Sequence, residues 1–250
     1  MDPVITAGIT KAKYGLHPIM IKAFMSGMFI AFGALGSQVI NSATGTSYMG
    51  AFIFPVGLIL VICTGSELFT GDCLMAMAVA DKKISLMDMI RTLLFVYIGN
   101  FIGSLFIVFM AYAGNMAEMF DGKLGETIMK TAAAKCTLSP GISFVKGILC
   151  NILVCAAVLV AIKTGETVGK MLAAFFPVML FVLCGFEHSI ANMYFIPMGQ
   201  LLSGIDMGLL LNNLIPVTLG NIVGGVGFAL GMYYCSHPNG VTKVNGDGSN

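Results

Sequence analysis

Charged residues are scarce in this sequence. Lysine, arginine, aspartate and glutamate together make up 10% of its 250 residues, and hydrophobic residues make up 57%. Soluble domains carry about 25% charged residues. A chain of this composition would expose too much apolar surface to water unless lipid were its solvent, so a soluble globular domain is excluded. The net charge of +1 gives no basis for nucleic-acid binding.

Paired cysteine motifs are also absent, and no cleavable leader is evident. The seven cysteines are odd in number, none forms a CxxC pair, and most lie inside apolar runs. They are therefore expected to be small buried hydrophobic residues, and a disulfide framework or a zinc site is poorly supported. The first apolar run lacks a small-residue cleavage motif and continues into a full span, so no signal peptide is expected.

The sequence instead contains long apolar runs. They are continuous rather than alternating, which argues against a β-barrel and predicts an all-α integral membrane protein. At about 20 residues per span, the chain accommodates six transmembrane helices. From run length and absence of charge, the spans are predicted at 20–43, 51–80, 92–114, 144–162, 171–197 and 207–234.

The whole chain, 1–250, is predicted to form a single membrane domain. Its predicted parts are a surface helix over 2–19, a first repeat over 20–114, a second repeat over 144–234 and a flexible tail over 236–250. With the N-terminus inside, nine of the thirteen lysines and arginines face the cytoplasm. Both termini are therefore predicted to be cytoplasmic, because basic residues concentrate on that side.

Two of the predicted spans are interrupted near the middle. The second is broken by TGSELFTGD at 64–72 and the fifth by CGFEHSIAN at 184–192, and each break contains glycine and a carboxylate. Irregular backbone at this depth must face protein or a water-lined cavity. A charged group there is a functional-site candidate by default.

The two halves of the chain resemble one another in order and spacing. The matched segments are 65–67 with 185–187, GNFIG at 99–103 with GNIVG at 220–224, and Lys22 with Lys146. Their offsets are 120, 121 and 124 residues. Three spans per repeat place the second half upside down, as an inverted 3+3 repeat. Broken helices 2 and 5 at corresponding positions then mark the permeation site.

His188 and two glutamates carry the candidate chemistry. His188 lies inside a predicted span beside Glu187, and it is either a hydrogen-bonded core histidine or a group that exchanges a proton with a weak-acid anion. Glu67 and Glu187 occupy equivalent repeat positions. They either repel anions or accept hydrogen bonds from backbone N–H groups at the broken helix ends, and the second interpretation is preferred because an unpaired buried carboxylate is costly.

Other polar residues have simpler interpretations. Lys146, just before the fourth span, is either a snorkelling anchor or a fixed positive charge that attracts anions. Asn100, Asn151, Asn192 and Asn221 are expected to form hydrogen bonds between helices, and the glycine-rich stretches let helices approach closely.

Several motifs together resemble the hallmarks of the formate/nitrite transporter family. They are GILCNILVCAA at 147–157, GSELFTG at 65–71, FEHSIANM at 186–193 and Pro197. The resemblance covers roughly 14–235, and within the family the chain looks most like the hydrosulfide channel branch of anaerobic bacteria. Ala156 and Cys63 depart from the family pattern, but both changes are small and neither identifies the substrate.

The resemblance implies a homopentamer in the bacterial inner membrane, with an aquaporin-like protomer and one pore in each. It implies a chamber between two hydrophobic constrictions. One constriction would consist of Leu58, Leu68 and Phe181, and the other of Phe54, Phe69 and Phe186. Thr70 would face His188 and form a hydrogen bond with it or with the solute, while Glu187 and Asn192 would support the site.

A channel or transporter for small monovalent anions of weak acids, not an enzyme, is the resulting prediction. Hydrosulfide is expected to be the main substrate, formate or nitrite should also permeate, and protonation occurs at the central His188 without a cofactor or metal. A neutral-solute channel of the water and glycerol type is the alternative, weakened by the lack of paired Asn-Pro-Ala boxes. A membrane enzyme or metal carrier is weaker still, because no HExxH-type spacing is present.

Overall fold

The computed structural model describes residues 2–204 and 208–236, and every regular element in them is a helix. The helices are α1 (Pro3–Ala12), α2 (Leu16–Thr44), α3 (Tyr48–Ile53), α4 (Val56–Thr64), α5 (Phe69–Asp72), α6 (Ala76–Ala80), α7 (Leu86–Ala113), α8 (Lys123–Cys136), α9 (Pro140–Lys163), α10 (Thr167–Leu183), α11 (Ser189–Ser203) and α12 (Gly208–Ser236), with 3₁₀ turns η1 (Cys73–Met75) and η2 (Met116–Glu118). The all-α prediction is confirmed.

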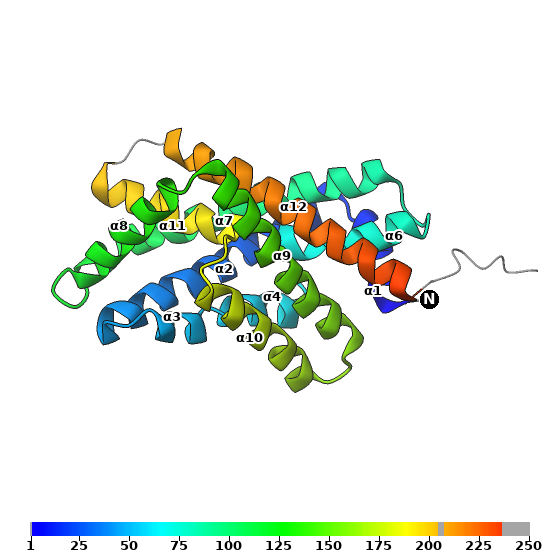
Figure 1. Ribbon diagram of the computed structural model, residues 1–250, viewed down its shortest axis with the longest axis horizontal. Helices are drawn as coiled ribbons and strands as arrows, with labels where there is room; N and C mark the ends of the chain where they lie inside the picture. Colours follow the sequence, from blue (N-terminus) through cyan, green and yellow to red (C-terminus); the bar gives the residue numbers. More distant parts are fainter. Residues whose placement is uncertain (1, 205–207, 237–250) are drawn as a thin grey trace, which may run out of the picture.

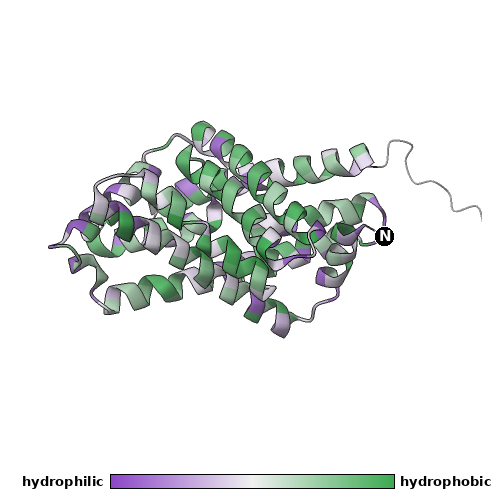
Figure 2. Cartoon of the chain, turned by 90° about the horizontal axis from the view of Figure 1, so that it is seen from below, coloured by the Kyte–Doolittle hydropathy of each residue, from purple (hydrophilic) through white to green (hydrophobic). Residues whose placement is uncertain are grey.

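Two of the short helices, α1 and α8, lie at opposite ends of the molecule. Figure 1 shows α1 at one end of the long axis and α8 at the other, with the long helices running between them. Hydrophilic residues gather toward these two ends, while the helices between them are predominantly hydrophobic (Figure 2). This distribution suits a molecule whose middle lies in lipid and whose ends reach water.

Helix length identifies most of the predicted spans. Five segments among the described residues are long and apolar enough to cross a bilayer: Leu16–Thr44, Ser47–Thr64, Leu86–Ala113, Pro140–Lys163 and Gly208–Ser236. The span predicted over 171–197 is divided between α10 and α11, of 17 and 15 residues. Length alone therefore yields five spans where the sequence predicts six, because neither piece of the divided span is long enough by itself.

The chain leaves the helical conformation at both predicted breaks. Helix α4 ends at Thr64, and Gly65 follows with φ of 67°. After α10, Gly185 has φ of 65°. Only glycine adopts this left-handed conformation without a steric cost, which explains the residue type at the equivalent position of both halves.

Two predicted boundaries need correction. The surface helix predicted over 2–19 ends at Ala12, because Gly15 takes an extended conformation and α2 already begins at Leu16. The segment 115–143, between the two predicted repeats, was given no helix in the sequence-based prediction, but it contains α8. The flexible tail predicted for 236–250 lies outside the described residues after Ser236.

Glycines bring pairs of long helices into backbone contact. A side chain at Gly103 of α7 would collide with the carbonyl oxygen of Phe24 in α2, and one at Gly224 of α12 would collide with that of Ile148 in α9. Gly103 and Gly224 correspond in the repeat, and so do Phe24 and Ile148. The two halves therefore pack their helices in the same way, at small-residue interfaces typical of membrane proteins.

Candidate functional site

Asn100 of α7 holds the first helix break. Its Oδ1 accepts a hydrogen bond from the N–H of Phe69 at 3.0 Å, and its Nδ2 donates to the carbonyl oxygens of Ala23 at 2.8 Å and Glu67 at 3.0 Å. The side chain is fully buried. One amide therefore satisfies backbone groups that the interruption of the helix would leave unpaired in a water-poor interior.

Asn221 of α12 holds the second break by the same three bonds. Its Oδ1 accepts from the N–H of Ser189 at 2.9 Å, and its Nδ2 donates to the carbonyl oxygens of Gly147 at 2.8 Å and Glu187 at 3.0 Å. Each residue in this set lies 120 to 124 positions later in the sequence than its counterpart around Asn100. The internal repeat predicted from sequence is thus visible in the hydrogen bonds of the site.

Thr70 and His188 meet between the two breaks. Thr70 Oγ1 lies 2.9 Å from His188 Nε2, and both residues are buried. His188 is also the N-cap of α11, where its Nδ1 accepts a hydrogen bond from the N–H of Ala191 at 3.1 Å. Because a backbone N–H only donates, Nδ1 carries no proton, so the ring is neutral with its proton on Nε2. The imidazole then donates to Thr70, whose hydroxyl hydrogen is available for another acceptor.

Aromatic rings border this polar pair. The ring of Phe181 stacks on His188, with centroids 5.8 Å apart, and the rings of Phe54 and Phe181 meet edge to face with centroids 5.7 Å apart. Phe54, Phe181, Phe186 and His188 line a cavity of about 190 Å³ on the α8 side. Phe181 therefore lies with Phe54, whereas the family resemblance implies that these two residues belong to different constrictions.

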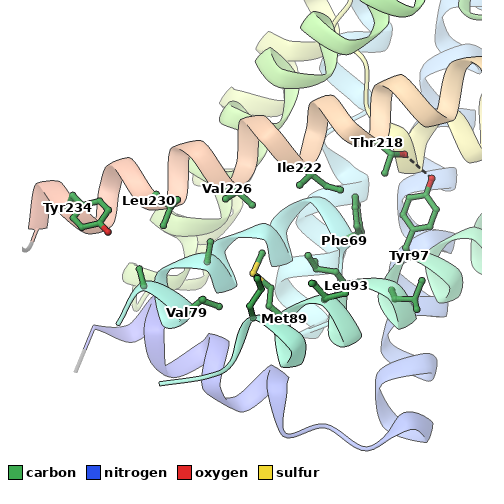
Figure 3. Close-up of a pocket in the computed structure, with 15 residues that line it drawn as sticks. Phe69, Val79, Met89, Leu93, Tyr97, Thr218, Ile222, Val226, Leu230 and Tyr234 are labelled. Atoms are coloured by element: carbon green, nitrogen blue, oxygen red, sulfur yellow. Dashed lines mark hydrogen bonds between the residues drawn. The ribbon is translucent and has the colours of Figure 1, made fainter. Parts of the chain in front are cut away.

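The remaining predicted constriction residues lie in three places. Leu68 lines a cavity of about 260 Å³ on the α1 side. Leu58 is buried on α4, one helical turn after Phe54. Phe69 lies apart from these, in an apolar groove of about 580 Å³ between α7 and α12, with its ring 4.8 Å from that of Tyr97 (Figure 3). The backbone N–H of Phe69 donates to Asn100 of α7, and this hydrogen bond directs the Phe69 side chain toward α7.

Glu67 is neutralised by a lysine from α1. Lys11 Nζ lies 2.6 Å from Glu67 Oε2 and also pairs with Asp72, while Lys22 Nζ lies 3.8 Å from Glu67 Oε1. Burial disfavours the charged form of Lys11, but the carboxylates of Asp72 and Glu67 outweigh that effect and raise its pKa above the usual value. Lys11 therefore remains an ammonium ion at neutral pH.

Glu187 is neutralised by a lysine from α8. Lys135 Nζ lies 3.0 and 3.2 Å from the two carboxylate oxygens, and Asn192 Nδ2 donates to Oε2 at 2.6 Å. The prediction that Glu67 and Glu187 accept backbone N–H bonds is therefore wrong. Helices α1 and α8 fold across the two breaks and supply ammonium groups instead, which offset the cost of burying each carboxylate.

Lys11 and Lys135 are not among the site residues predicted from sequence, although their spacing carries a signal. Lys11 precedes Lys22 by eleven residues, and Lys135 precedes Lys146 by eleven residues. Both pairs are therefore related by the same offset of 124 residues. The repeat extends beyond the predicted limits of 20–114 and 144–234 to include α1 and α8.

Lys146 lies at the edge of the α8-side cavities. Its carbonyl oxygen accepts the N–H of Glu187 at 3.3 Å, as that of Lys22 accepts the N–H of Glu67 at 3.4 Å. The side chain is half-buried and lines a surface hollow of about 780 Å³ that also contains Lys123, Lys130 and Lys135. The α8 end of the molecule thus gathers four ammonium groups and two carboxylates, those of Glu126 and Glu187, around one opening.

Metal-ligating groups do not cluster in the part of the chain that the structure describes. No three histidine, cysteine, aspartate or glutamate side chains within it are close enough to hold an ion. All seven cysteines are free, and Cys73, Cys150 and Cys155 are buried while Cys63, Cys184 and Cys235 are exposed. The expectation that most cysteines are buried is therefore only partly met.

Substituting Lys135 by glutamine should destabilise the fold by about 3 kcal/mol, because the substitution leaves the buried Glu187 without its counter-ion. Lys130→Gln, an exposed change on the same helix, is the matched control and should cost less than about 0.5 kcal/mol. Thermal unfolding of the detergent-purified proteins measures both. Equal stability of the two variants would contradict the importance of the Lys135–Glu187 pair.

Apolar helices interrupted at two buried polar breaks, with cavities approaching from both ends, define a multi-pass membrane transport protein. The family model for formate/nitrite transporters matches residues 1–235. The chain belongs to the formate/nitrite transporter family, and it is a transporter rather than an enzyme.

Three relatives illustrate this membership. A probable formate transporter of Methanothermobacter thermautotrophicus is 38% identical over 91% of this chain and 91% of its own length. A solved structure of a pentameric formate channel with formate bound is 34% identical, covers 89% of this chain and 97% of its own, and gives a TM-score of 0.79. A second structure, an FNT family ion channel, gives a TM-score of 0.85 at 28% identity over 93% and 96% of the two chains.

Proposed function

We propose that this chain conducts monovalent anions of weak acids across a membrane, with hydrosulfide, formate and nitrite as substrates. The observation that carries the proposal is the Thr70–His188 pair, buried between two cavities that each contain a lysine–glutamate pair. Formate is favoured because similar proteins are described as formate transporters and channels. Hydrosulfide is favoured by the resemblance of the sequence to the hydrosulfide channel branch. All three anions have a small neutral conjugate acid, which is the property that the mechanism requires.

Ammonium groups attract the anion to the entrance. On the α8 side, Lys146 and Lys135 lie at the opening of the cavity that leads to His188. On the α1 side, Lys11 and Lys22 line the corresponding cavity. Fixed positive charges at a narrow entrance raise the local concentration of anions and their rate of entry.

The apolar middle of the path passes the neutral acid. Desolvating a bare anion between Phe54 and Phe181 would cost far more free energy than its contacts in the site would recover. The anion therefore takes up a proton before it crosses. Neutral His188 holds Thr70 in place, and the Thr70 hydroxyl donates a hydrogen bond to the solute. The proton comes from water in the cavity or through His188, and the acid ionises again on the far side.

The assembly and orientation follow from the relatives and from charge. A pentamer with one path per protomer accords with the pentameric formate channel that this chain resembles. The distribution of basic residues favours an orientation with α1 toward the cytoplasm and α8 outside, in the bacterial inner membrane that the family resemblance implies.

Flux into proteoliposomes tests the proposal. Purified protein is reconstituted, and uptake of hydrosulfide, formate and nitrite is compared at two pH values. Uptake above that of empty vesicles, rising as the pH falls, is the expected result, and the order of the three anions identifies the preferred substrate. Glycerol-driven swelling without anion uptake would replace the proposal with a neutral-solute channel.

A further inference from the structure

Asp72 breaks the symmetry of the two polar clusters. With the offset of 120 residues that relates the two breaks, Glu67 corresponds to Glu187 and Asp72 corresponds to Asn192. Asn192 is neutral and donates a hydrogen bond to Glu187 at 2.6 Å. Asp72 places a second carboxyl group at the equivalent point, where it shares the ammonium group of Lys11 with Glu67.

One oxygen of Asp72 has no partner in the described part of the chain. Asp72 Oδ1 pairs with Lys11, but Oδ2 is buried and forms no hydrogen bond with any described residue. The residue is 2% exposed and lines the α1-side cavity. A buried carboxylate oxygen without a donor is costly as an anion, whereas a proton on it removes the charge and supplies a donor.

The surrounding groups give the two clusters different charges. The charged groups near Asp72 are Lys11 of α1, Lys22 of α2 and Glu67 in the break. The thiols of Cys73 in η1 and Cys155 in α9 are also close to it. The same cavity is lined by Lys170 of α10 and by Tyr14, which precedes α2. The α1-side cavity is thus lined by three ammonium groups, those of Lys11, Lys22 and Lys170, and by two carboxyl groups, those of Glu67 and Asp72. The α8-side hollow is lined by four lysines and by two carboxyl groups, those of Glu126 and Glu187. With every group charged, the α1 side carries one positive charge fewer than the α8 side.

We propose that Asp72 is a proton-binding site that controls the entry of anions from the α1 side. With Asp72 ionised, its charge cancels part of the attraction that Lys11 and Lys22 exert on an anion. A proton taken from water neutralises the carboxylate, and the α1-side cavity then attracts anions as the α8-side cavity does. This inference rests on the proposed function and adds a dependence on the pH of one side.

The test compares the two sides of the membrane in the full-length protein. Formate uptake is measured in right-side-out and inside-out membrane vesicles, with the bath pH varied from about 5 to about 8 and the internal pH held constant. A protease-accessible N-terminal tag identifies the vesicles in which α1 faces the bath. Because acidification also increases the amount of free neutral acid, the α8-side rate of the same protein is the reference.

Asp72→Asn is the decisive variant, since it reproduces the amide found at the equivalent position of the second half. In the wild-type protein, the ratio of α1-side to α8-side uptake should rise roughly threefold to tenfold as the bath is acidified, the effect of one unit charge near the entrance. In Asp72→Asn the ratio should be high and independent of pH. Asn192→Asp should transfer the pH dependence to the α8 side.

Asp121→Asn is the matched control, an exposed carboxyl group outside both clusters. It should leave the wild-type ratio unchanged. A pH-dependent ratio in Asp72→Asn equal to that of the wild type would overturn the proposal, and so would a uniform loss of uptake from both sides with lower thermal stability, which a purely structural role predicts. Absence of uptake in the wild type would instead contradict the proposed function itself.

Discussion

Replacing His188 with phenylalanine is expected to reduce anion flux by about 10²-fold or more, the usual contribution of a positioned acid–base or donor group. The substitution removes both ring nitrogens and thus the contact that holds Thr70 at 2.9 Å. Phenylalanine conserves the planar shape that stacks on Phe181. The oligomer should therefore still assemble, and the loss should appear in proteoliposome flux and not in size-exclusion chromatography.

Two further variants serve as a control and as a test of which role His188 plays. His17→Phe makes the same chemical change at an exposed position near the start of α2 and should leave flux unchanged. His188→Gln retains a hydrogen-bond donor but not a titratable group. If His188 acts as a donor in its neutral form, the glutamine variant keeps measurable flux, whereas a loss as deep as that of phenylalanine would assign the proton transfer to His188 itself. Full flux in His188→Phe would remove the residue from the mechanism.

Replacing Asn221 with alanine should destabilise the protein by roughly 3 to 5 kcal/mol, because three buried backbone groups lose their partner at once. The N–H of Ser189 and the carbonyl oxygens of Gly147 and Glu187 would remain in a site that the long helices enclose. The corresponding change at Asn100 should have a similar effect, since its three bonds are equivalent.

Thermal unfolding in detergent measures this loss, and Asn212→Ala is the matched control. Asn212 is exposed on the same helix, α12, so its truncation should change stability by less than about 0.5 kcal/mol. A destabilisation of Asn221→Ala no larger than that of the control would mean that the breaks are held by other contacts. The idea that paired asparagines fix both breaks would then fail.

The breaks were predictable from sequence because their signal is local. Glycine and a carboxylate in the middle of an apolar run conflict with an uninterrupted helix in lipid, and this conflict is readable without knowledge of the fold. The matching of Gly65 with Gly185 and of Glu67 with Glu187 made the two positions stand out further. The contact between Thr70 and His188, implied by the family resemblance, has the expected geometry in the structure.

The partners of the two glutamates were harder to predict, because they depend on where the surface helices fold. Lys11 and Lys135 lie in short polar segments that look like ordinary membrane flanks, and only the direction in which α1 and α8 return brings them to the breaks. The position of Phe69 depends in the same way on a distant residue, since Asn100 orients the first turn of α5. Such long-range contacts leave little trace in local composition.

The equivalence of α1 with α8 has a consequence for the origin of the molecule. Each half consists of a short helix carrying a lysine near its C-terminus, followed by three apolar segments, and the offset of 124 residues from Lys11 to Lys135 also relates Lys22 to Lys146. A gene encoding one such half, inserted into the membrane in both orientations, would build the same pair of asparagine-held breaks as a homodimer. In a single chain the two halves need not be identical, and Asp72 opposite Asn192 is a difference in charge within two equivalent sets of backbone contacts.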